Sequence, residues 1–220
     1  MIVKIVQTAS NIKQRFYIDS NNFYLEGECG NISRLQSITL FNQNVTIQGV
    51  YRISKWVHYI PLRYLFGKAN ITGTFSLSRN GRPYGTIVFS KHGFLKSFYM
   101  ITLEAQTVLH CYTCVKGSFH YVSVYNGMVQ IALIETYLNT TDFKYTHKLY
   151  ILEEYKRYAD KLSFFVVYYA SFRLIRRFHM SSGSFYVKSW SFSKYNDKYD
   201  PTWRQKNFPD ENFFGKMHLF

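Results

Sequence analysis

Apolar and polar residues alternate with a period of two along many short runs of the chain. Thr74–Ser78 is one such run, and Asn80-Gly81 follows it before Tyr84–Phe89 resumes the pattern. Asn and Gly tolerate positive φ, so these residues predict a hairpin with a tight two-residue turn. Similar runs recur at intervals of about 8–12 residues, separated by Gly- and Asn-rich turns, which is typical of an antiparallel sandwich or barrel.

The segment Tyr155–Arg177 follows neither an alternating nor an amphipathic pattern. Its centre, Leu162–Phe172, is apolar or aromatic at almost every position, which predicts an element surrounded by protein. This apolar centre is too short to span a bilayer, which takes about 20 apolar residues. Charges that suit a helix dipole flank it, namely Glu153, Glu154, Arg176 and Arg177. A helix is the preferred interpretation, and the β-branched and aromatic run Phe164–Tyr169 leaves a strand as the alternative.

Together these patterns predict a mostly β fold, a closed antiparallel β-barrel around a central hydrophobic α-helix at about Tyr155–Arg177. Closing the sheet removes its edge strands, and an all-round apolar helix would fill the interior. The chain shows no repeats or linkers, so residues 1–220 are expected to form a single domain. From about residue 193 an aromatic and charged tail is expected to dock on it through Trp203, Phe208, Phe213 and Phe214.

Charge adds a candidate function. The net charge is +14, which predicts attraction to an anionic partner, either a membrane surface or nucleic acid. No acidic residue occurs between Glu28 and Glu104. That interval holds nine basic residues, namely Arg34, Arg52, Lys55, Arg63, Lys68, Arg79, Arg82, Lys91 and Lys96. A basic protein with a solvated, functionless face is the plainer interpretation.

Four of these basic residues are the predicted binding site for anionic lipid headgroups: Arg52, Lys55, Arg63 and Lys68. They surround Trp56, Tyr59 and Tyr64, and basic residues beside amphipathic aromatics suit a membrane interface. The same aromatic residues could instead belong to the core. Arg173, Arg176 and Arg177 form a second basic group, for which termination of the helix is the simpler interpretation.

Other candidate chemistry is weaker. His110, Cys111, Cys114 and His120 have the residue types of a metal site, but a strand would point Cys111 and Cys114 to opposite faces. Glu153 and Glu154 are expected to mark the helix start, and Asp160 to pair with Arg157 or Lys161. No nucleophile elbow, phosphate-binding loop or zinc-protease motif is present, so we predict a non-enzyme with no catalytic residues, cofactor or metal.

Three stretches resemble a known family. They are the hairpin Phe75–Phe89, the run Tyr125–Ile134 with His147–Glu154 and the apolar segment after it, and the tail Ser191–Trp203. In this order they resemble the tubby C-terminal-like superfamily, in the bacterial group akin to the LURP-one-related and phospholipid scramblase-like proteins. The resemblance implies a barrel of roughly a dozen strands around a hydrophobic helix. Its eukaryotic members bind phosphoinositide headgroups through basic residues, and no motif transfers that site residue by residue.

The expected function is therefore binding of anionic lipid headgroups at the cytoplasmic face of a membrane. Three cysteines do not suit a disulfide scaffold, and Met1–Ser10 lacks the pattern of a signal peptide, so a cytoplasmic location is expected, peripheral to the membrane and without a transmembrane segment. A protein-interaction module with no lipid role is the alternative. Nucleic acid ranks last as a partner, since no recognition motif for it is present.

Overall fold

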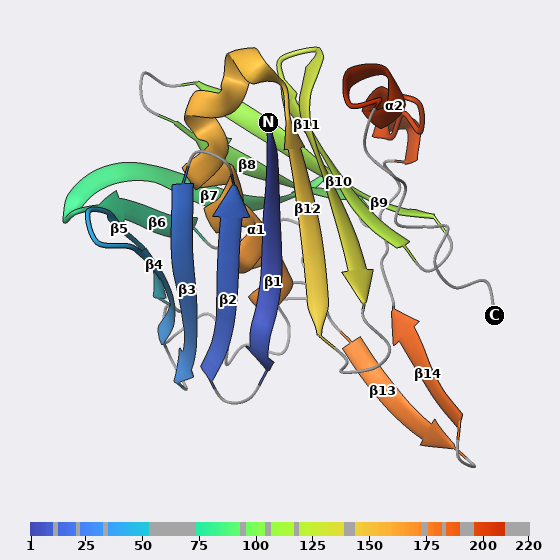
Figure 1. Ribbon diagram of the computed structural model, residues 1–220, viewed down its shortest axis with the longest axis horizontal. Helices are drawn as coiled ribbons and strands as arrows, with labels where there is room; N and C mark the ends of the chain where they lie inside the picture. The colour runs from blue at the N-terminus through green and yellow to red at the C-terminus, as the bar shows by residue number, and fades with distance from the viewer. Residues whose placement is uncertain are drawn as a thin grey trace.

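Figure 1 shows the chain in a computed structural model that describes residues 1–10, 13–20, 23–32, 35–52, 74–92, 96–103, 107–116, 119–138, 144–172, 176–181, 184–189 and 196–209. The first twelve strands are β1 (Ile2–Ser10), β2 (Lys13–Ser20), β3 (Phe23–Ile32), β4 (Leu35–Phe41), β5 (Thr46–Arg52), β6 (Thr74–Arg79), β7 (Arg82–His92), β8 (Lys96–Thr102), β9 (Val108–Lys116), β10 (Phe119–Asn126), β11 (Val129–Leu138) and β12 (Tyr145–Ile151). Then come the 3₁₀ helix η3 (Glu153–Tyr158), the helix α1 (Ala159–Phe172), strands β13 (Arg176–Ser181) and β14 (Ser184–Ser189), and a tail with η4 (Asn196–Lys198) and α2 (Trp203–Asn207).

The twelve strands form one large antiparallel sheet in which each strand pairs with the next along the chain. β1 also pairs with β12, with Ile2 opposite Tyr150 and Val6 opposite Thr146. In Figure 1 the sheet curves around α1, with β1 and β2 in front of the helix and β7 and β8 behind it. The prediction of a mostly β, antiparallel fold with one buried helix is confirmed. β13 and β14 form a separate two-stranded sheet.

The predicted hairpin shows why these residues form strands. Phe75 and Leu77 of β6 are buried in the core, and Thr74 and Ser76 face outward. This alternation buries one face of the strand and leaves the other in water. The turn between β6 and β7 has positive φ at both central residues, 48° at Asn80 and 79° at Gly81. The predicted two-residue turn is therefore confirmed.

The helix prediction is confirmed at its centre and wrong at its end. Every residue from Lys161 to Tyr169 is buried, as the unbroken apolar run predicts. However, Arg176 and Arg177 do not close the helix, because they begin β13 and pair with Ser189 and Lys188 of β14. Backbone partners from a second strand replace helical hydrogen bonds there, so helix termination does not explain these arginines. Arg173 lies outside the described residues.

Side chains of very different size cover the two faces of α1. Its backbone lies closest to β1 and β12. Away from these strands, the rings of Phe164 and Tyr168 contact Phe75 of β6, at centroid distances of 6.0 and 5.1 Å. Gly49 of β5 makes room for them, since a Cβ there would lie 2.2 Å from Phe75 and 2.4 Å from Phe164.

The sheet has two ends, which we call rims. The upper rim holds the start of α1 and the turns 41–46, 80–81 and 126–129, because alternate strand directions bring these turns to one end. The lower rim is the opposite end, where β5 stops at Arg52 and β6 begins at Thr74. In the described part of the chain, no helix has both the length and the hydropathy needed to cross a bilayer.

Candidate functional site at the upper rim

Only Arg52 of the predicted lipid site belongs to the described residues, and it lies at the lower rim. Arg52 is the last residue of β5, where its backbone is paired with Leu35. Lys55, Arg63 and Lys68 belong to residues 53–73, which are outside the described part of the chain, as are Trp56, Tyr59 and Tyr64. That these basic side chains form one site stays a prediction.

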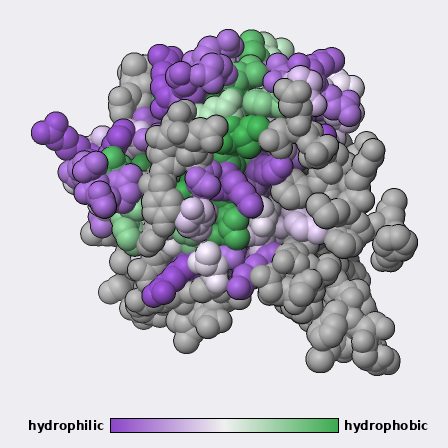
Figure 2. All heavy atoms as spheres, in the orientation of Figure 1, coloured by the Kyte–Doolittle hydropathy of each residue, from purple (hydrophilic) through white to green (hydrophobic). Residues whose placement is uncertain are grey.

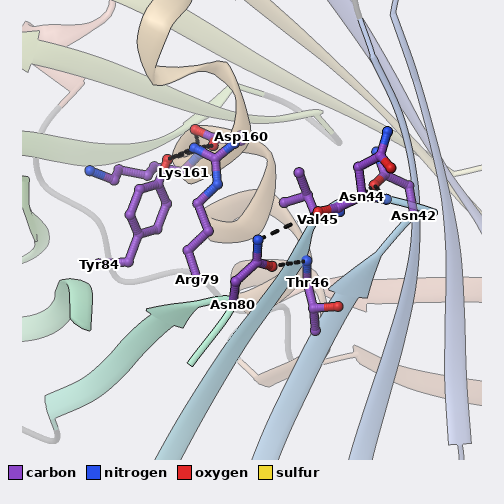
Figure 3. A network of polar contacts seen from close by, with 9 residues as sticks. All are labelled: Asn42, Asn44, Val45, Thr46, Arg79, Asn80, Tyr84, Asp160 and Lys161. Carbon is purple, nitrogen blue, oxygen red and sulfur yellow. Dashed lines mark hydrogen bonds and ion pairs between the residues drawn. The ribbon is translucent and has the colours of Figure 1, made fainter. Parts of the chain in front are cut away.

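A polar cluster that the sequence did not indicate lies at the upper rim. Tyr84 of β7 donates a hydrogen bond to Asp160 of α1 at a distance of 2.5 Å. Arg79 of β6 forms an ion pair with the same carboxylate at 3.3 Å. Figure 3 shows these side chains converging from the hairpin and the first turn of the helix. Asp160 also accepts a hydrogen bond from the backbone N–H of Lys161. The carboxylate thus lies at the N-terminus of α1, where a negative charge is stabilising.

Burial determines the chemistry of this cluster. It raises the pKa of Tyr84, and the hydrogen bond and charge of Asp160 raise it further, so the phenol keeps its proton at neutral pH. Lys161 is only 4% exposed, and its ammonium lies 3.9 Å from the centre of the Tyr84 ring, a cation–π contact. Each polar group of the cluster therefore has a partner: the Tyr84 phenol and Arg79 contact the Asp160 carboxylate, and Lys161 contacts the Tyr84 ring. The arrangement suits anchoring of the helix start better than proton transfer.

Asparagine side chains connect the neighbouring turns of this rim (Figure 3). Asn80 accepts a hydrogen bond from the backbone N–H of Thr46 at 2.8 Å and donates one to the carbonyl of Asn44 at 3.4 Å. Asn42 accepts from the N–H groups of Asn44 and Val45 within its own turn. The hairpin β6–β7 is thereby held against the β4–β5 turn, which orients Arg79 toward the helix.

The outer part of the upper rim exposes both cations and apolar side chains. The Arg79 side chain is 43% exposed, and Arg82 lies opposite it across the turn. The tip between β10 and β11 exposes Met128 by 89% and Val129 by 53%. On the face seen in Figure 2, hydrophobic residues reach the upper rim between two hydrophilic regions. This combination can contact an anionic surface or an apolar patch of another protein.

The acidic residues at the start of η3 behave as the sequence predicts. Glu153 and Glu154 lie in the first turn of that helix, which confirms that they mark its start. Glu153 accepts a hydrogen bond from Lys156 at 2.6 Å and lies 3.7 Å from the amino group of Met1. The hydrogen bond and charge of Lys156 lower the pKa of Glu153, which therefore stays ionised.

The four residues considered for a metal site lie on different faces of the sheet. Cys111 belongs to the core around α1, whereas Cys114 belongs to a second apolar cluster on the outer face, so the predicted separation of the cysteines is confirmed. His120 faces inward opposite Thr136, and His110 faces outward with Cys114. Burial raises the pKa of both thiols, to about 12 for Cys114, so neither is a thiolate at neutral pH.

A row of polar side chains lies on the inner face of the sheet. His147 of β12 is fully buried between Ile5 and Thr136, and its Nδ1 lies 2.9 Å from the Thr136 hydroxyl oxygen. Its Nε2 has no hydrogen-bond partner among the described residues. Burial lowers the pKa of His147 to about 3, so the ring is neutral at physiological pH. Alternation along β12 predicts that this residue faces inward, but not that its charge is suppressed.

Comparison with protein-family models, curated proteins and solved structures finds no match for this chain.

Proposed function

We propose that this protein is a non-enzymatic binding module of the tubby-like kind, a closed β-barrel whose own helix occupies the interior, and that it binds anionic lipid headgroups at the cytoplasmic face of a membrane. The pairing of β1 with both β2 and β12 supports the closed barrel. One observation carries the functional proposal, namely the dense filling around α1, where every residue from Lys161 to Tyr169 is buried. Because the interior is filled, a ligand would bind at the rims or on the outer surface.

The charge of the surface supports an anionic ligand. The chain carries +14, and its acid-free interval supplies Arg52, Lys55, Arg63 and Lys68. Clustered arginines and lysines pair with phosphate groups, and arginine can do so through two parallel hydrogen bonds. A basic side chain near an anionic bilayer contributes about 1 kcal/mol of binding free energy.

Sedimentation with vesicles of graded anionic lipid content tests this proposal. Binding should rise with anionic content and weaken between low and physiological salt. Replacing Arg52, Lys55, Arg63 and Lys68 by glutamine should lower the partition coefficient about a thousandfold at low salt, since each contributes about 1 kcal/mol. The matched control replaces Lys4 of β1, Arg15 of β2, Lys148 of β12 and Lys144, which directly precedes β12. Equal binding to neutral and anionic vesicles would reject the proposal, and equal losses for the two variants would reject the site.

A protein-interaction module is the second candidate function, and the exposed tip at Met128 and Val129 favours it. An apolar hairpin tip that stands in water is more typical of a protein contact than of headgroup recognition. Photocrosslinking from position 128, with position 4 as the control, should capture one protein if this function is correct. Crosslinking of the same proteins from both positions would contradict it.

A further inference from the structure

The tail covers an apolar area on the outer face of β9–β12. Trp203 is buried there with Cys114, Tyr121, Leu133 and Tyr150, and Tyr199 and Phe208 pack against the same cluster. The rings of Tyr121 and Tyr199 lie 4.4 Å apart, and those of Tyr150 and Phe208 lie 5.3 Å apart. We call this area the tail-docking face. Its aromatic surface would be exposed to water if the tail were elsewhere.

Directional contacts make this face selective. Arg204 of α2 forms an ion pair with Glu135 of β11 at 3.5 Å, and the two side chains are only 6% and 8% exposed. The indole N–H of Trp203 donates to the carbonyl of Gln130 at 3.3 Å. An unpaired buried charge is costly, so the face requires a segment that supplies an aromatic residue with a cation directly after it.

Strands β13 and β14 lie between α1 and the tail in the chain. β13 and β14 pair with each other in their own two-stranded sheet, and Figure 1 shows this hairpin extending away from the large sheet. Residues 190–195 then lead to the tail, and six residues can span about 20 Å. The docked segment therefore follows α1 in the chain only after the β13–β14 hairpin and residues 190–195. Exchange of an identical docked element between two copies is domain swapping, a low-cost route to a dimer.

We propose that the tail-docking face also accepts residues 196–209 of a second copy of this chain, so that two copies associate by reciprocal exchange of their tails. The second copy is the occupant because its tail carries the aromatic residues and the arginine that this face contacts. Both arrangements make the same contacts, so their balance depends on concentration. A segment tethered by a short linker acts at an effective concentration of about 1 mM, and exchange should increase as the protein approaches that value.

Charge reversal separates the two arrangements. In Glu135→Arg the docking face repels its own tail, and in Arg204→Glu the tail repels its own face. In a mixture, each face meets a tail of opposite charge on the other chain, so a reciprocal dimer restores both ion pairs. Sedimentation velocity should show monomers for either variant alone and a 1:1 dimer for the mixture. The double variant Glu135→Arg/Arg204→Glu is the control, and it should behave as the wild type does.

Each outcome decides the proposal. A mixture that stays monomeric while the double variant folds would overturn it, because the reversed pair would then form only within one chain. If a single variant does not fold alone, the two are refolded together, and rescue as a 1:1 dimer is expected. If the double variant also fails to fold, the wild type is examined up to about 1 mM. A dimer that Trp203→Ala abolishes is then expected, and a wild type that stays monomeric would overturn the proposal.

Discussion

The two faces of α1 solve the same packing problem in different ways. The face near β1 and β12 carries small or β-branched side chains, namely Ala159, Ser163, Val166, Val167 and Ala170, as the 3.6-residue period places them. The opposite face carries Phe164, Phe165, Tyr168 and Tyr169, whose rings contact Phe75 and Tyr99. The helix therefore lies close to one wall, and aromatic rings fill the wider space on the other side. Size, not polarity, distinguishes the faces.

The largest expected effect comes from removing a ring on the wide side. Phe164→Ala should lower the free energy of unfolding by about 3–5 kcal/mol, because the fully buried ring leaves a cavity. Val166→Ala on the narrow side removes fewer carbon atoms and should cost about 2 kcal/mol. Urea denaturation measures both values. Equal losses would mean that the aromatic face is no more tightly packed than the other.

A pH-dependent effect should follow from His147 on the narrow side. Its pKa is about 3 in the folded protein, and the unfolded chain has the ordinary value of about 6.5. The unfolded chain binds the proton first, so this contribution to stability is complete above pH 6.5 and is lost as the pH falls toward 3. The slope is about 1.4 kcal/mol per pH unit. His147→Gln should remove it in urea titrations between pH 4 and 6, and an unchanged slope would assign the dependence to other groups.

A smaller loss is expected where the backbone makes room for the rings. Gly49→Ala would place a methyl group within 2.4 Å of both Phe75 and Phe164. Such overpacking costs about 1–3 kcal/mol, since the rings must leave their preferred positions. Gln48→Ala, at an exposed position of the same strand, is the control and should change stability by less than about 0.5 kcal/mol. Combining Gly49→Ala with Phe164→Leu should recover part of the loss if the contact with the ring is its cause.

The smallest effect should come from the one hydroxyl in the middle of the narrow side. Ser163 is fully buried, and its Oγ has no hydrogen-bond partner among the described residues. Ser163→Ala removes a polar group that costs free energy to bury, so stability should stay the same or rise by about 1 kcal/mol. Ser163→Leu should instead destabilise by about 1–3 kcal/mol, because the helix lies close to this wall. A thermal shift series compares the two variants. If Ser163→Leu stabilises the protein, α1 does not lie close to β1 and β12 at this position.

Local patterns were sufficient to predict most of the elements. Alternation identified β6 and β7, and Asn80-Gly81 identified the turn between them. The unbroken apolar run identified α1, although its end was placed too late, since Arg176 begins β13. That error has a physical cause. Basic residues stabilise the end of a helix, but they do not stop the chain from pairing with a later strand.

The contacts of the candidate site could not be predicted in the same way. Tyr84 and Asp160 are 76 residues apart, and nothing in either neighbourhood indicates the other. The ion pair between Glu135 and Arg204 also joins residues far apart in the chain, and no local sequence pattern predicts it. The sequence does predict that Trp203 and Phe208 hold the tail to the sheet, because exposed aromatic residues are costly. It does not predict which strands they meet.

The sequence by itself determined which residues avoid water, because period and side-chain polarity are local properties of the chain. It determined the class of fold, the two-residue turn at Asn80-Gly81 and the burial of α1 from Lys161 to Tyr169. Only the tertiary structure decided that α1 lies nearer to β1 and β12, that Asp160 meets Arg79 and Tyr84, and that His147 is held neutral. These outcomes depend on distances and on desolvation, which arise when remote segments pack together.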